Sequence, residues 1–110
     1  MADFLYLFRN VPVKQSPEQM QKTMPKWQAW MGELSKAGAL KGGEPLAPEG
    51  RQLVGKAKRL VDGPFTEAKD VVGGYLIVTA KDLNHATELA RGCPIFDEEG
   101  QVEIRPIGVM

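Results

Sequence analysis

The chain has 110 residues, of which 43% are hydrophobic and 25% charged, and its 14 basic and 14 acidic residues give a formal net charge of zero. These values are typical of a single folded domain, here residues 1–110, and they exclude a disordered or collagen-like chain. A neutral chain favours neither nucleic acid nor an anionic membrane as a direct partner. The single cysteine, Cys93, excludes an internal disulfide, so the predicted location is a reducing compartment, the cytoplasm.

The first ten residues, MADFLYLFRN, contain a short apolar run without a basic leader, so they predict neither a signal peptide nor a spanning helix. They predict a strand instead. Phe4, Tyr6 and Phe8 would point to one face and Leu5 and Leu7 to the other, because side chains alternate along a strand. Both sets are apolar, so both faces of this strand need cover.

A helix is predicted from Ser16, which combines an N-cap serine with Pro17 at the first helical position and a glutamine three residues after the cap. Gly38 predicts its end. Pro25 predicts a kink or a break after Thr23, because proline lacks the N–H that the helix needs. The apolar stripe of this helix consists of Met20, Thr23, Met24, Trp27, Met31 and Leu34.

The middle of the chain predicts four further strands. Ala39–Glu44 is followed by a turn-rich connection over residues 45–50, and Arg51–Val54 with Arg59–Val61 forms a hairpin around Gly55. Val71–Ala80 is the clearest strand, and again both of its faces are largely apolar. Tyr75, Ile77 and Thr79 would lie on one face of it, and Leu76, Val78 and Ala80 on the other.

Asp82 predicts the N-cap of a second helix that ends near Arg91, and Gln101–Pro106 predicts a last strand at a sheet edge. The buried stripe of that helix would be Leu83, Ala86, Leu89 and Ala90. The resulting order predicts an α+β fold of the ferredoxin-like, split βαβ type, with two helices on one face of an antiparallel sheet. Because the helices leave one apolar face bare, we expect a homodimer that packs through the sheet faces.

These elements also carry a resemblance to a known family. The residues that carry it are Asp62-Gly63-Pro64-Phe65, Glu67, Lys69, Gly73-Gly74-Tyr75 and Ala90-Arg91-Gly92-Cys93-Pro94. They resemble the DGPF-domain branch of the YCII-related family. The resemblance implies a dimeric α+β barrel, in which two ferredoxin-like sheets face each other. It also implies an association with sigma factors, because some members are encoded beside sigma factors or fused to them. Many members have no established activity.

The resemblance also limits what can be transferred. The YCII branch carries a His and Asp pair proposed as an acid/base dyad, and these two positions correspond here to Trp27 and Cys93. Neither side chain can perform that proton chemistry, so the dyad does not carry over. The wider barrel superfamily includes isomerases, cofactor-free oxygenases and haem proteins, which leaves the reaction open.

Asp62, Glu67 and Lys69 are the candidate catalytic residues. A carboxylate beside a lysine can act as a general base with an electrostatic stabiliser when the pair is partly desolvated. The alternative is structural: Asp62 would cap the turn before Gly-Pro, and Glu67 with Lys69 would form a solvated ion pair.

The candidate ligand contacts are Tyr6, Trp27, Gly73, Gly74 and Tyr75. Trp27 belongs to the helical stripe, with Trp30 at its flank, so core packing competes with an aromatic wall for a ligand. The two glycines have a backbone role first, because they let another element or a ligand approach closely.

No cofactor or metal site is predicted, because His85 is the only histidine and lies off the buried stripe of its helix. Cys93 is interpreted as a small buried filler at a helix end. Two functions stay open. The first is an enzyme of proton-transfer, isomerase or lyase type, acting on a small organic substrate in a cleft between sheet and helices. The second is a non-catalytic ligand-binding or accessory module linked to sigma-factor regulation.

Overall fold

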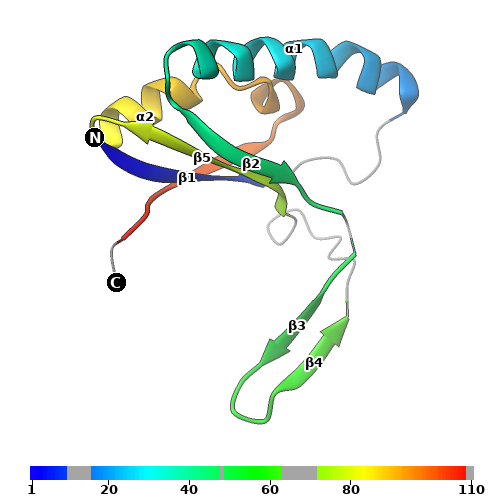
Figure 1. Cartoon of the computed structure of the whole chain (residues 1–110). Helices are drawn as coiled ribbons and strands as arrows, with labels where there is room; N and C mark the ends of the chain where they lie inside the picture. Colours follow the sequence, from blue (N-terminus) through cyan, green and yellow to red (C-terminus); the bar gives the residue numbers. More distant parts are fainter. Residues whose placement is uncertain (10–15, 48, 63–71, 109–110) are drawn as a thin grey trace.

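The structure of the protein is a computed structural model that describes residues 1–9, 16–47, 49–62 and 72–108. Its sheet has the strand order β2-β5-β1-β6 with antiparallel neighbours, and α1 and α2 cover one face of it (Figure 1). The predicted α+β ferredoxin-like fold is therefore confirmed. The elements are β1 (Ala2–Arg9), α1 (Pro17–Lys36), β2 (Leu40–Pro45), β3 (Arg51–Val54), β4 (Arg59–Asp62), β5 (Val72–Ala80), α2 (Leu83–Ala90), the 3-10 helix η2 (Pro94–Glu98) and β6 (Gln101–Pro106).

The two central strands alternate as predicted. In β1, Phe4, Tyr6 and Phe8 are buried under the helices, and Leu5 and Leu7 are partly exposed on the opposite face. In β5 the buried positions are Gly74, Leu76, Val78 and Ala80, and the partly exposed ones are Tyr75, Ile77 and Thr79. Strands β2 and β6 lie at the two edges of the sheet.

Helix α1 begins with the predicted capping box. The Ser16 hydroxyl accepts a hydrogen bond from the Gln19 N–H at 3.2 Å, and the Gln19 side chain accepts one from the Ser16 N–H at 3.3 Å. Gly38, with φ of +73°, follows the end of the helix. Of the kink or break predicted at Pro25, the break is wrong, because α1 is one continuous helix of 20 residues. Pro25 lies on the exposed side, where water can bond the carbonyl that its missing N–H leaves free.

The two tryptophans of α1 have exchanged the expected roles. Trp30, predicted at the flank, is only 4% exposed, and Trp27 is partly exposed. The cause is α2, which lies beside α1: the Trp30 indole N–H donates to the Leu89 carbonyl at 3.1 Å. The Trp30 ring also stacks on the ring of Tyr6, with centroids 6.3 Å apart.

Helix α2 starts at the predicted cap, where the Asp82 carboxylate accepts a hydrogen bond from the His85 N–H at 2.8 Å. Ala86 and Ala90 are buried as predicted, but Leu83 is 47% exposed, so its assignment to the buried stripe is wrong. Leu83 is the first residue of a helix only eight residues long, and its side chain lies outside the contact with the sheet. No helix in the described part of the chain is long and apolar enough to cross a membrane.

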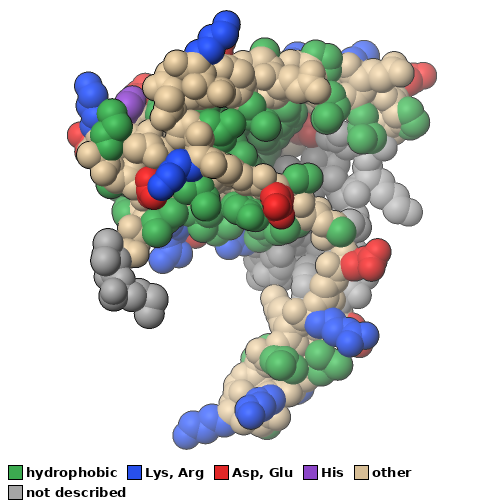
Figure 2. Space-filling model, in the orientation of Figure 1, with side chains coloured by type: hydrophobic (Ala, Val, Ile, Leu, Met, Phe, Trp, Pro, Cys, Tyr) green, Lys and Arg blue, Asp and Glu red, His purple; other side chains and the backbone are tan. Residues whose placement is uncertain are grey.

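The predicted hairpin forms a separate two-stranded sheet from β3 and β4, with Arg51 paired to Asp62 and Leu53 to Leu60. It extends away from the four-stranded sheet on the side opposite the helices (Figure 1). Hydrophobic and basic side chains are exposed on it (Figure 2).

Candidate ligand-binding cavity

A cavity of about 500 Å³ lies between α1 and the sheet, near the end of β1 that carries Phe8. This volume is within the range of small-molecule pockets, about 300–1,000 Å³. Its lining from α1 consists of Thr23, Met24, Trp27, Gln28 and Met31. Its lining from the strands consists of Phe8, Gly43, Glu44, Pro45, Gly73, Gly74, Tyr75 and Leu76.

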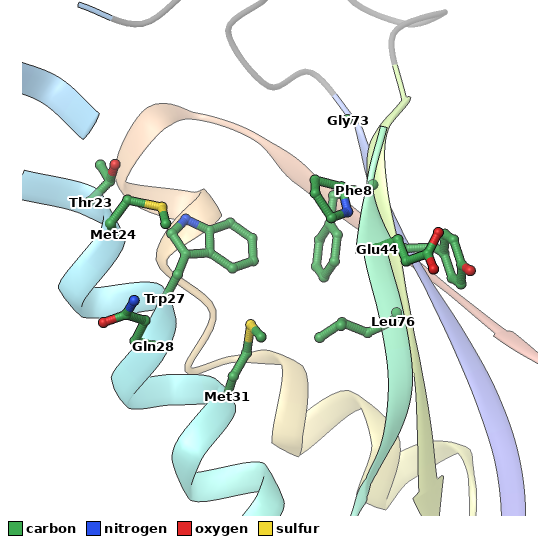
Figure 3. Close-up of a pocket in the computed structure, with 13 residues that line it drawn as sticks. Phe8, Thr23, Met24, Trp27, Gln28, Met31, Glu44, Gly73 and Leu76 are labelled. Atoms are coloured by element: carbon green, nitrogen blue, oxygen red, sulfur yellow. The ribbon is translucent and has the colours of Figure 1, made fainter. Parts of the chain in front are cut away.

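The walls of the cavity are apolar and partly aromatic. Met24, Trp27 and Met31 on α1 face Phe8 and Leu76 on the sheet (Figure 3). The rings of Phe8 and Trp27 meet edge to face, with centroids 5.2 Å apart. Methionine side chains are flexible and polarisable, so the helical wall can adapt to the shape of a guest. The cavity therefore suits a small apolar molecule, and a flat ring in particular.

The polar residues of the lining direct their polar atoms elsewhere. The Thr23 hydroxyl donates to the Gln19 carbonyl at 3.0 Å, one turn back along α1. The polar ends of Gln28 and Glu44 point away from the space between α1 and the sheet (Figure 3). Tyr75 alternates with the buried Leu76, so its side chain lies on the uncovered face. Among the described lining residues, none aims a titratable group into the cavity.

Two glycines allow β2 and β5 to approach each other closely at the cavity wall. A Cβ at Gly74 would lie 3.0 Å from the Glu44 carbonyl oxygen and 3.2 Å from the Pro45 Cα. Gly43 has φ of +155°, and a Cβ there would overlap the Leu76 side chain. The predicted backbone role of Gly74 is thus confirmed.

Of the five predicted ligand contacts, Trp27, Gly73 and Gly74 line the cavity, and the fourth, Tyr75, borders it only with its backbone, because its side chain lies on the uncovered face. The fifth, Tyr6, is fully buried beneath α2, where its hydroxyl donates to the Ala86 carbonyl. Burial raises the pKa of Tyr6 to about 12, so the phenol is neutral. Tyr6 is a core residue beside the cavity and not part of its lining.

The predicted catalytic residues are not brought together within the described part of the chain. Asp62 ends β4, where its carboxylate pairs with the Arg51 guanidinium at 3.0 Å and is 67% exposed. It does not line the cavity. Glu67 and Lys69 lie outside the described residues.

The sequence profile of the YCII-related domain matches residues 3–110. The chain belongs to the YCII-related family. No curated protein matches this chain. A similar solved structure is the 5-chloro-2-hydroxyhydroquinone dehydrochlorinase of Burkholderia phenoliruptrix AC1100, in complex with 2,5-dihydroxybenzoquinone. The alignment has a TM-score of 0.59 and 16% identity and covers 98% of this chain and 95% of that one, so the likeness is one of fold.

In this YCII-related chain Cys93 is buried and His85 takes part in a helix cap, so the surroundings of both residues indicate structural roles. Burial raises the pKa of the Cys93 thiol to about 12, which keeps the thiol neutral. The His85 Nδ1 accepts a hydrogen bond from the Lys81 N–H at 3.0 Å, which makes it part of the α2 cap. The described residues contain no group of three or more His, Cys, Asp or Glu side chains placed to hold a metal ion.

Sequence reasoning missed Phe8, Met24, Met31 and Leu76 as cavity residues, because it assigned them to core faces or to the helical stripe. One available signal was the composition of the stripe, in which three of six positions are methionine. Methionine fills irregular spaces and is frequent at adaptable binding surfaces.

Proposed function

We propose that this YCII-related protein binds a small, largely apolar organic molecule with an aromatic or quinonoid ring in the cavity between α1 and the sheet. The observation that carries the proposal is the cavity itself, of about 500 Å³, whose lining includes the aromatic rings of Phe8 and Trp27 in edge-to-face contact. The dehydrochlorinase of the same fold supports it, since the molecule named in that complex is a six-membered dihydroxyquinone.

The chemistry that we propose for this site is proton transfer of isomerase or lyase type. Glu67 would act as the general base and Lys69 as the electrostatic stabiliser of the charge that develops on the substrate. Chain connectivity supports their involvement: Lys69 is four residues from Gly73, which lines the cavity. We assign Asp62 a lesser part, because its carboxylate already pairs with Arg51. The DGPF string at residues 62–65 supports the assignment to the DGPF branch.

A second candidate function is binding without catalysis, as in an accessory module that partners a sigma factor. It is favoured by the absence of any titratable group aimed into the cavity from the described walls. We also infer a cytoplasmic location from the lone cysteine, which is buried and reduced.

We further propose that two copies pair through the uncovered faces of their sheets. The centre of that face is apolar, and ion pairs surround it, as is usual for protein interfaces. The central residues are Leu5, Leu7, Tyr75 and Ile77, and the surrounding pairs are Lys41 with Asp3 and both Arg9 and Arg105 with Glu103.

Binding is tested by a thermal-shift screen of hydroxylated benzenes and benzoquinones against small aliphatic acids. We expect the ring compounds to raise the melting temperature and to quench the fluorescence of Trp27. Met24→Trp should fill the cavity and abolish the shift. Met20→Trp is the matched control, because Met20 lies one turn earlier at nearly equal exposure, 48% against 49%, and does not line the cavity. Equal loss in both variants would contradict the proposal.

Catalysis is tested on whichever compound binds, by following its conversion with the wild-type protein and with Glu67→Gln and Lys69→Met. We expect both variants to keep the thermal shift and to lose turnover, with a smaller loss for Asp62→Asn. A compound that binds tightly and is recovered unchanged from the wild-type protein would favour the accessory module.

A further inference from the structure

The β3–β4 hairpin exposes apolar side chains that its own chain leaves uncovered. Leu53 and Leu60 are paired across the two strands and are 69% and 52% exposed, and Val54 is 42% exposed. An isolated two-stranded hairpin is marginally stable in water, and three strands or a packed helix are normally needed. A hairpin that displays leucines in this way therefore gains stability from a partner surface.

That surface is not provided by the described part of the same chain. The hydrophobic core consists of residues from the four-stranded sheet, α1, α2 and η2, together with Ala39 and Cys93 just before β2 and η2, and no hairpin residue belongs to it. The projecting hairpin also expands the molecule: the radius of gyration is 15.3 Å, against about 13 Å for a compact domain of this length.

The direction of the hairpin indicates where a partner would lie. It extends beyond the sheet on the side opposite the helices, which is the side of the uncovered face (Figure 1). Sheets that pack face to face lie about 10 Å apart. A second body on the face of Leu5, Leu7 and Ile77 would therefore stand alongside the hairpin.

Charge favours a second copy of this chain as that body. The hairpin, residues 51–62, contains four basic residues and one acid, which gives it a net charge of +3. Because the whole chain is neutral, the rest of it carries −3. The hairpin of one copy would thus meet a body of opposite net charge in another copy. The basic residues are Arg51, Lys56, Lys58 and Arg59, and the acid is Asp62.

We propose that the β3–β4 hairpin is a clasp that lies against the body of a second copy, with Leu53 and Leu60 as its apolar anchors. Two-fold symmetry makes the clasp reciprocal, so each copy both gives and receives a hairpin. The ion pair of Arg51 with Asp62 fixes the hairpin at its base. This inference rests on the sheet-face pairing proposed above and adds a second, separate contact to it.

The test measures dimer dissociation by sedimentation for the double variant Leu53→Ser, Leu60→Ser, which removes the apolar anchors and leaves the charge of the hairpin unchanged. Both side chains are exposed in the monomer, so the fold should survive the change. We expect the dissociation constant to rise at least about tenfold, and the wild-type constant to rise with salt concentration. The matched control, Met20→Ser with Leu83→Ser, makes the same kind of change at apolar positions that are 48% and 47% exposed on the helices, and it should leave dimerisation unchanged.

Hydrogen exchange at several protein concentrations supplies the second readout. We expect the amides of β3 and β4 to become protected as the dimer forms. Unchanged dissociation in the double variant, or hairpin exchange that is independent of concentration, overturns the clasp and leaves the sheet-face dimer standing. A hairpin that becomes protected while Leu7→Lys has no effect on dimerisation overturns the sheet-face pairing and, with it, the position of the clasp beside that face. A wild-type protein that is monomeric at all concentrations overturns both.

Discussion

The helix-covered face of the sheet has two ends that differ in how many elements cover them. At one end Tyr6 lies beneath α1 and α2 together, with Trp30 stacked on its ring and Ile95 from η2 in the same buried cluster. At the other end α1 extends past α2 (Figure 1), and Phe8 and Trp27 line the cavity. The same aromatic residue types therefore make a closed core where a second helix is present and a cavity where it is absent.

The largest expected effect contrasts the two tryptophans. Trp30→Ala should lower the free energy of unfolding by about 4 kcal/mol, because it removes a buried ring and leaves the Leu89 carbonyl without its donor. Trp27→Ala should lower it by about 2 kcal/mol, because Trp27 is partly exposed and already borders a cavity. Urea denaturation measures both. Equal losses would mean that the two ends are packed alike.

The next largest effect is a loss of stability at alkaline pH, which we expect from the end of the sheet that α1 and α2 cover together, here called the closed end. Burial raises the pKa of Tyr6 from 10.0, and that of the Cys93 thiol from 9.0, to about 12 in both cases. Both groups are neutral in the fold and ionise more easily when unfolded, so their contribution is complete below about pH 9 and is lost as the pH rises towards 12. The loss is on the order of 3 kcal/mol for Tyr6 and 4 kcal/mol for Cys93.

Unfolding by urea at pH 8 and pH 10.5 measures this dependence. Tyr6→Phe and Cys93→Ala should each flatten the decline in stability between the two pH values. If the free energy of unfolding declines in parallel in the wild type and in both variants, then the closed end does not exclude water as the burial of these side chains implies.

A smaller effect is expected at the glycines of the cavity wall. Gly43→Ala should destabilise by about 2 kcal/mol, because the new methyl group would overlap Leu76 at a φ that alanine rarely adopts. Gly42→Ala is the control, since no heavy atom lies within 4 Å of the position that its Cβ would take. It should change stability by less than about 0.5 kcal/mol. Similar losses at both positions, measured by urea denaturation, would mean that the close approach of β2 is unimportant.

The elements of the fold were predictable because their signals are local. The capping box at Ser16, the alternation of β1 and the turn at Gly55 each depend on a few neighbouring residues. The wrong predictions concern side chains whose burial depends on segments that are distant in the sequence. Trp30 is buried by α2, some 60 residues along the chain, and the exposure of Leu83 depends on where a short helix meets the sheet.

The site was only partly predictable for the same reason. Trp27 and Gly74 could be proposed as contacts because an aromatic residue on a helix and a glycine pair opening a strand are visible in sequence. The cavity results from the difference in length between α1 and α2, which have 20 and 8 residues. The volume that this difference leaves open depends on packing and is not encoded in any local pattern.

The prolines that end the two edge strands have a consequence for solubility. The Leu46 N–H bonds inward to the Gly73 carbonyl, and the Ile107 N–H bonds inward to that of Asp3. Since successive amides alternate in direction, Pro45 and Pro106 occupy outward positions where another residue would offer a free N–H. An incoming strand finds no donor at these points, so both edges resist the growth of a continuous intermolecular sheet. A chain that leaves one apolar face bare is thus protected from fibril-like stacking through its edges.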